Sequence, residues 1–161
     1  DIGSSTGGFT DCLLQHGAKK VHAYDAGTNQ LSWKIRSDPR VLSREKLNCR
    51  YLIKNDIDDL IDLIVIDVSF ISLTKILPAA YDVGSSNCSI ITLIKPQFEL
   101  SRDEVSKGGI VKDPELHQKS VSKIVNYATS ELQLSHDGTI NSPITGSGGN
   151  IEFLAHFIKT S

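Results

Sequence analysis

Two short runs of almost continuous aliphatic residues, residues 63–68 and Ser89–Ile94, constrain the possible fold more than any other feature of this sequence. Strands that are apolar on successive residues, rather than on alternate ones, are typical of a parallel sheet covered on both faces. Segments with helical spacing lie before, between and after the two runs. The chain is therefore expected to be an α/β protein with a mostly parallel sheet and helices on both faces.

The remaining elements are expected to alternate in the same way. Helices are predicted over residues 10–16 with Thr10 as N-cap, over residues 29–36 and 73–81, and from Asp113 to about residue 132. Strands are predicted over residues 21–25, from Val41, around Ile140 and over residues 151–159. Only residues 141–150 connect the last two strands, which is too short for a parallel crossover, so the last strand is expected to be antiparallel.

Composition narrows the class of protein. With 161 residues, of which 39% are hydrophobic, the chain is long enough for one domain with its own core. A formal net charge of −2 argues against nucleic-acid binding through bulk positive charge. The three cysteines (Cys12, Cys49 and Cys88) form no CxxC pair, so no metal site is expected. No apolar run of membrane-spanning length and no signal peptide are visible, and a cytoplasmic location is expected.

The chain begins with a glycine-rich turn that an acid leads and a helical pattern follows, DIGSSTGGFT. Backbone with so little side-chain bulk lets a polar ligand lie directly on it. Ser5 stands where the dinucleotide motif GxGxxG has its second glycine, and no GK[ST] follows, so neither that motif nor a Walker loop is present. Such a turn normally follows a buried strand, of which only Ile2 is present. The first strand is therefore expected to be truncated or disordered.

Three charged residues stand at the carboxyl ends of predicted strands or just beyond them, where open α/β sheets bind their ligands. Asp25 is placed to accept hydrogen bonds from ribose hydroxyls, and Asp67 and Lys95 end the two buried runs, where they could pair. An acidic turn beside a ribose-binding acid suits a nucleoside with positive charge, and S-adenosylmethionine meets both demands. The plainer alternatives are a tight turn at the glycines, a helix cap at Asp25, a structural ion pair of Asp67 with Lys95, and an exposed edge carboxylate at Glu152.

Five ordered segments, DIGSSTGGFTD, IDVSFISL, LIKPQFE, KGGIVKDPELH and GNIEFL, resemble the TlyA group of the FtsJ-like methyltransferases over essentially all 161 residues. The resemblance implies a Rossmann-like domain over residues 1–161 that uses S-adenosylmethionine to methylate ribose 2′-hydroxyls of ribosomal RNA, and it suggests cytidine as the target. Of the family's Lys-Asp-Lys-Glu tetrad, Asp67, Lys95 and Glu152 are present. The first lysine and an S4-like RNA-binding domain would precede this chain, which is therefore expected to be poorly active alone.

The chemistry of these residues suggests a role for each. Lys95 would contact the 2′-oxygen and stabilise its developing negative charge. Asp67 would orient Lys95 and lie near the methyl group, and Glu152 would either position the first lysine of the tetrad or help to fix the Lys95 geometry. The expected cofactor set is Asp1, Gly3, Ser4, Ser5, Thr6, Gly7, Gly8, Phe9, Asp25, Asn48 and Asp67, in which Asn48 is either an adenine contact or part of an ordinary turn. Within the polar segment 100–112, the cations expected to bind RNA phosphates are Arg102, Lys107 and Lys112, unless the segment is only a solvated connector.

Two other classes of function stay open from the sequence. Family members are often labelled haemolysins, and a non-catalytic or membrane-active protein could retain the nucleoside-binding fold. Pore formation, however, should leave a long apolar or strongly amphipathic segment, and none is seen. A nucleotide-dependent oxidoreductase is disfavoured by the missing GxGxxG motif and by the set of Asp67, Lys95 and Glu152. Calorimetry with S-adenosylmethionine and with NAD separates these classes.

Overall fold

Six strands and the single residue Ile2 form the central sheet of the computed structural model, which describes residues 1–160. The strands are β1 (Val21–Tyr24), β2 (Val41–Arg44), β3 (Leu63–Ile66), β4 (Ser89–Ile94), β5 (Ser135–Asn141) and β6 (Phe153–Ile158). The pairs β1–β2 and β3–β4 are parallel, whereas β6 is antiparallel to both β4 and β5. Ile2 forms parallel bridges to Tyr24 and Ile66, which gives the order β2–β1–Ile2–β3–β4–β6–β5.

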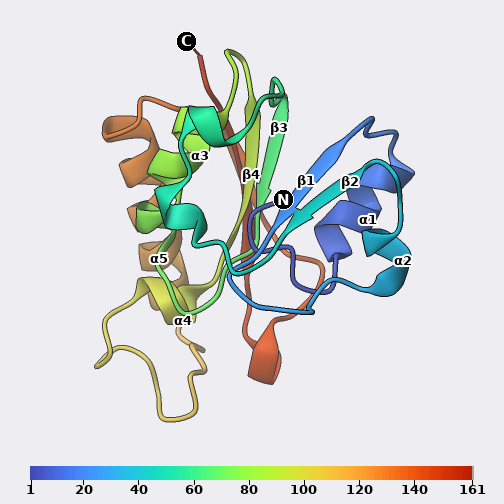
Figure 1. Cartoon of the computed structure of the whole chain (residues 1–161). Coiled ribbons are helices and arrows are strands. Elements are labelled where there is room, and N and C mark those ends of the chain that lie inside the picture. Colours follow the sequence, from blue (N-terminus) through green and yellow to red (C-terminus); the bar gives the residue numbers. More distant parts are fainter. Residues whose placement is uncertain (161) are drawn as a thin grey trace.

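Helices cover both faces of this sheet. On one side lie α1 (Gly8–Gln15) and α2 (Trp33–Arg36), and on the other lie α3 (Leu77–Val83), α4 (Pro96–Glu99) and α5 (Pro114–Ser130) (Figure 1). Four 3-10 turns complete the regular structure: η1 (Cys49–Tyr51), η2 (Lys54–Asp56), η3 (Leu73–Lys75) and η4 (Ser147–Gly149). The predicted fold class is therefore confirmed, including the antiparallel last strand.

The predicted strands and the last helix form for the expected local reasons. Ile66, Ile90 and Ile94 expose no surface at all, because helices cover the two central strands. The carboxylate of Asp113 accepts a hydrogen bond from the N–H of Glu115 at 2.9 Å, and proline occupies the first helical position. The helix α5 consequently begins where the sequence predicts it.

Several predicted element boundaries are wrong. Thr10 is not an N-cap: α1 begins at Gly8, after Gly7 in the left-handed region, and the buried hydroxyl of Thr10 donates to Asp1 instead. The predicted helix over residues 29–36 is reduced to α2, since the N–H of Ser32 donates to the carbonyl of Thr6 and holds the preceding residues as a loop. The predicted helix over residues 73–81 is divided into η3 and α3, and the last strand starts at residue 153 rather than 151.

An open groove of about 590 Å³ runs between β1 and β3, on the side of Ile2 away from the glycine turn. Val21, Ile64 and Val83 line it, and the nearby Leu60 is 82% exposed. Charged side chains, among them Lys20 and Asp59, line the groove as well. Among residues 1–160, the helices are all too short or too polar to cross a bilayer.

Candidate active site

The glycine-rich turn is built on Ile2, whose backbone ties it to the ends of two strands. The N–H of Ile2 donates to the carbonyl of Val65, and the N–H of Asp67 donates to the carbonyl of Ile2, both at 2.9 Å. Gly3 follows with φ +82°, and its N–H donates to the carbonyl of Tyr24. A Cβ at Gly3 would collide with the backbone carbonyl of Asp67. Glycine is thus required at this position, and the turn lies directly against Asp67.

Two carboxylates touch the turn. Asp1 accepts a hydrogen bond from the hydroxyl of Thr10 at 2.6 Å through Oδ2, while its Oδ1 is shielded from solvent and has no partner among the described residues. Asp25 accepts from the N–H of Ser5 at 2.8 Å and from the N–H of Gly27 at 2.7 Å. Asp25 therefore closes a local turn and also ties the end of β1 to the glycine turn. A shielded carboxylate oxygen is costly without a donor, so Oδ1 of Asp1 suits a cationic ligand.

Asn48 is exposed and caps η1, where its Oδ1 accepts a hydrogen bond from the N–H of Arg50 at 3.2 Å. This hydrogen bond supports the alternative in which Asn48 belongs to an ordinary turn. The adenine contact stays a prediction.

Asp67 and Lys95 meet at the carboxyl ends of the neighbouring strands β3 and β4. Nζ of Lys95 lies 2.5 Å from Oδ1 of Asp67 and donates to the hydroxyl of Ser69 at 3.1 Å. The Lys95 side chain is 13% exposed and that of Asp67 is 35% exposed. The ammonium is therefore mostly shielded. Oδ1 of Asp67 is shielded too and meets Lys95 as an ion pair without hydrogen-bond geometry, while the rest of the Asp67 side chain reaches solvent.

Glu152 immediately precedes β6 and is 6% exposed, so the exposed-edge alternative is wrong. Burial raises the pKa of Glu152 above its ordinary value of 4.5; the charge of Lys95 and a hydrogen bond from Gln97 oppose this effect, and the charge of Asp67 adds to it. Nε2 of Gln97 donates to Oε1 of Glu152 at 3.5 Å. The backbone of Gly146 packs directly on this carboxylate. The structure therefore couples Glu152 electrostatically to Asp67 and Lys95.

The polar segment 100–112 is exposed at Arg102, Lys107 and Lys112, and none of the three forms an ion pair with another described residue. Its second half is anchored by the side chain of Asn150, which is 3% exposed. Oδ1 of Asn150 accepts from the N–H of Val111, and its Nδ2 donates to the carbonyl of Gly109, both at 2.9 Å. The segment thus presents its cations to solvent, and its second half is held in place by Asn150, which stands two residues before Glu152.

Phe70 is a feature that the sequence analysis misses. It is 91% exposed, has φ +64°, and follows Ser69, the hydrogen-bond partner of Lys95. Its ring centroid lies 5.0 Å from that of Phe98. A left-handed conformation is uncommon for a bulky residue and clusters at functional sites. The sequence does carry a signal for Phe70: an aromatic residue stands three positions after Asp67, beyond the buried strand, where packing in the core does not call for one.

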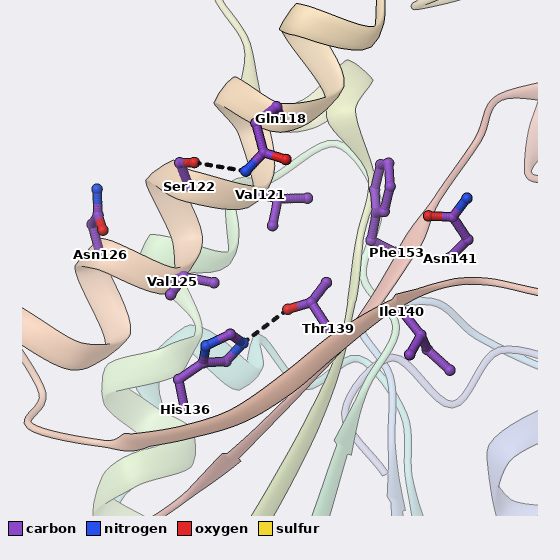
Figure 2. Close-up of a pocket in the computed structure, with 10 residues that line it drawn as sticks. All are labelled: Gln118, Val121, Ser122, Val125, Asn126, His136, Thr139, Ile140, Asn141 and Phe153. Atoms are coloured by element: carbon purple, nitrogen blue, oxygen red, sulfur yellow. Dashed lines mark hydrogen bonds between the residues drawn. The ribbon is translucent and has the colours of Figure 1, made fainter.

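A second hollow, of about 400 Å³, lies between α5 and the strands β5 and β6. Figure 2 shows Gln118 and Ser122 on the helix facing His136, Thr139 and their neighbours on the strands. None of the candidate site residues lines this hollow. Over residues 1–160, no cluster of three or more histidine, cysteine or acidic side chains is arranged to hold a metal ion.

The whole chain, including the glycine turn and the Asp67–Lys95 pair, is similar to known proteins. The FtsJ-like methyltransferase family matches residues 1–159. The chain belongs to this family. It is 52% identical to Hemolysin A of Brachyspira hyodysenteriae, an alignment that covers 98% of this chain and 66% of that protein. It is 44% identical to the 16S/23S rRNA (cytidine-2′-O)-methyltransferase TlyA of Mycobacterium tuberculosis, over 96% of this chain and 57% of that protein.

Among solved structures, a "putative hemolysin from Lactococcus lactis" superposes with a TM-score of 0.95 at 51% identity, over 99% of this chain and 76% of that one. The chain thus spans about three fifths to two thirds of the length of the two curated relatives. The names of the relatives point in two directions, haemolysis and RNA methylation. The site geometry is therefore needed to choose between them.

Proposed function

We propose that the protein transfers a methyl group from S-adenosylmethionine to a ribose 2′-hydroxyl of ribosomal RNA, with cytidine as the target nucleotide. The observation that carries the proposal is the 2.5 Å contact between Nζ of Lys95 and Oδ1 of Asp67, at neighbouring strand ends and against the glycine turn. Family membership and the TlyA relative support the choice of an RNA ribose as acceptor. Haemolysis has no comparable structural support in residues 1–160.

The residues at the turn fit S-adenosylmethionine. Its amino group matches the unpartnered Oδ1 of Asp1, and the slim backbone from Gly3 to Gly8 leaves room for the methionine moiety. Each carboxylate oxygen of Asp25 accepts one backbone hydrogen bond and retains lone pairs for ribose hydroxyls. When bound, the cofactor supplies a sulfonium methyl group that is already activated for transfer.

The chain's own residues act on the ribose oxygen. Lys95 holds a cationic group where negative charge develops on the 2′-oxygen, and a preorganised charge shielded from water is effective there. The oxygen gains the methyl group and gives up its proton to solvent, and S-adenosylhomocysteine is left as the neutral thioether. Asp67 and Ser69 each contact Nζ of Lys95 and so fix its direction. Glu152 contributes a third carboxyl group, whose pKa is raised mainly by its burial, while the charge of Lys95 opposes that rise. The reaction on the protein side thus needs positioning and charge rather than a covalent intermediate.

RNA binding is assigned to the surface around this site. Arg102, Lys107 and Lys112 supply local positive charge to a chain whose net charge is −2. Phe70 offers an exposed ring beside the Lys95 site, which suits stacking on a base turned out of its helix.

The test is Lys95→Ala in the full natural protein, with Lys20→Ala as the matched control. Lys20 also forms a lysine–aspartate pair, at 2.7 Å to Asp59, but outside the site. Lys95→Ala should lower methyl transfer to ribosomal RNA by about 10²–10³-fold while leaving the dissociation constant of S-adenosylmethionine nearly unchanged. Wild-type turnover in this variant would refute the mechanism, and binding of NAD in place of S-adenosylmethionine would refute the function.

A further inference from the structure

A buried carboxylate lies behind the two catalytic strand ends. Glu99, the last residue of α4, has a side chain that is only 2% exposed. It accepts hydrogen bonds from the hydroxyl of Ser72 at 2.5 Å and from the backbone N–H of Leu73 at 2.7 Å. Nζ of Lys123, on α5, lies 3.2 Å from its Oε2 and also donates to its backbone carbonyl. A carboxylate this deeply buried is costly unless such partners compensate for its lost hydration.

The partners of Glu99 belong to the segments that carry the proposed catalytic pair. Glu99 stands four residues after Lys95, and Ser72 stands five residues after Asp67. The same two segments meet again at the Phe70–Phe98 ring contact and at the hydrogen bond from Lys95 to Ser69. The side chain of Glu99, in the segment after β4, therefore bonds to a side chain and to the backbone of the segment after β3.

We propose that Glu99 is a positioning residue, which sets the distance between Lys95 and Asp67 by fastening the segment after β4 to the segment after β3. It touches neither reacting group itself. Its carboxylate form is required because one oxygen accepts from Leu73 and the other accepts from Ser72 and faces Lys123. A neutral amide in its place would accept through one oxygen only and would turn an N–H₂ group toward the Ser72 hydroxyl and the Lys123 ammonium.

The test compares Glu99→Gln with Asp59→Asn in the full natural protein. Asp59 pairs with Lys20 at 2.7 Å, away from the catalytic and RNA-binding segments, so the control also turns an ion-paired carboxylate into an amide. In Glu99→Gln, kcat at saturating S-adenosylmethionine should fall by about 10- to 100-fold, as expected for a displacement of about 1 Å at reacting groups. The dissociation constant of S-adenosylmethionine should stay within about twofold of wild type, and crystal structures of the two proteins should show Lys95 and Asp67 further apart in the variant than in the wild type. Asp59→Asn should leave all three quantities unchanged.

An unchanged kcat in folded Glu99→Gln would overturn the proposal. So would a fall in kcat matched by an equal loss of cofactor affinity, because that pattern indicates general loosening of the fold. If Glu99→Gln does not fold, Ser72→Ala decides in its place. It removes the hydroxyl that donates to Glu99, together with the bonds of that hydroxyl to Thr74 at the start of η3, and it buries no new group. A lower kcat with unchanged cofactor affinity supports the proposal, and an unchanged kcat overturns it. The kinetic part rests on the proposed function; if the wild-type protein methylates no RNA, that function fails, and the Lys95–Asp67 separation in the variant crystal alone decides the positioning role.

Discussion

Replacing Gly146 with alanine should lower turnover strongly while leaving the protein folded. Gly146 has φ −76° and ψ −171°, which an alanine adopts without strain. A Cβ at this position would overlap the carboxylate of Glu152, far inside the 3.0 Å that Cβ atoms keep from their neighbours. The carboxylate must therefore move by about 1 Å, and a misplacement of that size at an active site costs about 10²-fold in rate.

The effect on stability should be small by comparison. The overlap involves the end of a side chain rather than backbone, so rotation of Glu152 relieves it. Rotation nevertheless breaks the 3.5 Å contact with Gln97 and changes the balance of charge with Lys95 and Asp67. By contrast, Gly3→Ala combines a positive φ of +82° with a collision against the backbone of Asp67, and it should impair folding itself.

The assay is transfer of a radiolabelled methyl group to ribosomal RNA at saturating S-adenosylmethionine, with thermal unfolding measured in parallel. Gly138→Ala is the matched control, because a Cβ there meets nothing within 4 Å. A folded Gly146→Ala protein with wild-type kcat would refute the reasoning, since it would show that the placement of Glu152 does not matter for turnover. A crystal structure in which Glu152 has not moved would refute the steric argument.

Three further predictions concern single side chains. Asp25→Ala should weaken S-adenosylmethionine binding by about 10- to 100-fold in calorimetry, because each hydrogen bond to a charged group is worth about 1.5–3 kcal/mol, and turnover should recover at saturating cofactor. Glu152→Gln should raise the thermal stability at about pH 7. Burial raises the pKa of Glu152 in the folded state, so the folded state binds this proton more tightly than the unfolded state does. The stability of the wild type therefore falls as the pH rises above 4.5, and an uncharged glutamine avoids this loss. The difference in Tm between Glu152→Gln and wild type should vanish toward about pH 4, and an equal difference at both pH values would contradict the assignment. Asp113→Ala should cost about 1 kcal/mol of unfolding free energy in urea titration through loss of the α5 cap, without a change in kcat.

The parts of the fold that the sequence predicts well are those that local chemistry determines. The strands β3 and β4 follow from continuous apolar runs, and α5 follows from Asp113 and Pro114 at its start. The boundaries that differ depend on contacts distant in sequence. Thr10 bonds to Asp1, and Ser32 bonds to the glycine turn, so both leave the local roles that their residue types favour.

The same distinction applies to the candidate site. Asp67 and Lys95 are visible in the sequence because a charge that ends a buried strand is unusual. Glu99, Gly146 and Asn150 lie near the site residues in sequence, but their partners Leu73, the Glu152 carboxylate and Val111 are visible only in the tertiary structure. Phe70 lies between these cases, since its sequence context marks the site while its exposure and positive φ are visible only in three dimensions.

The backbone of Ile2 joins two parts of the molecule that have separate apolar cores. The smaller core lies between α1, α2, β1 and β2, and its buried members are Leu14, Val21, Ala23, Leu31, Ile35 and Val41. The larger core holds β3, β4, β6 and the helices that cover them, and it includes Ile2 and Tyr24. Amide hydrogens of the smaller part should therefore exchange with solvent through partial opening events that leave the β4–β6 pairing intact. A ligand that contacts both the glycine turn and Asp67 would suppress those openings, so cofactor binding should slow amide exchange throughout β1 and β2, including residues that it does not touch.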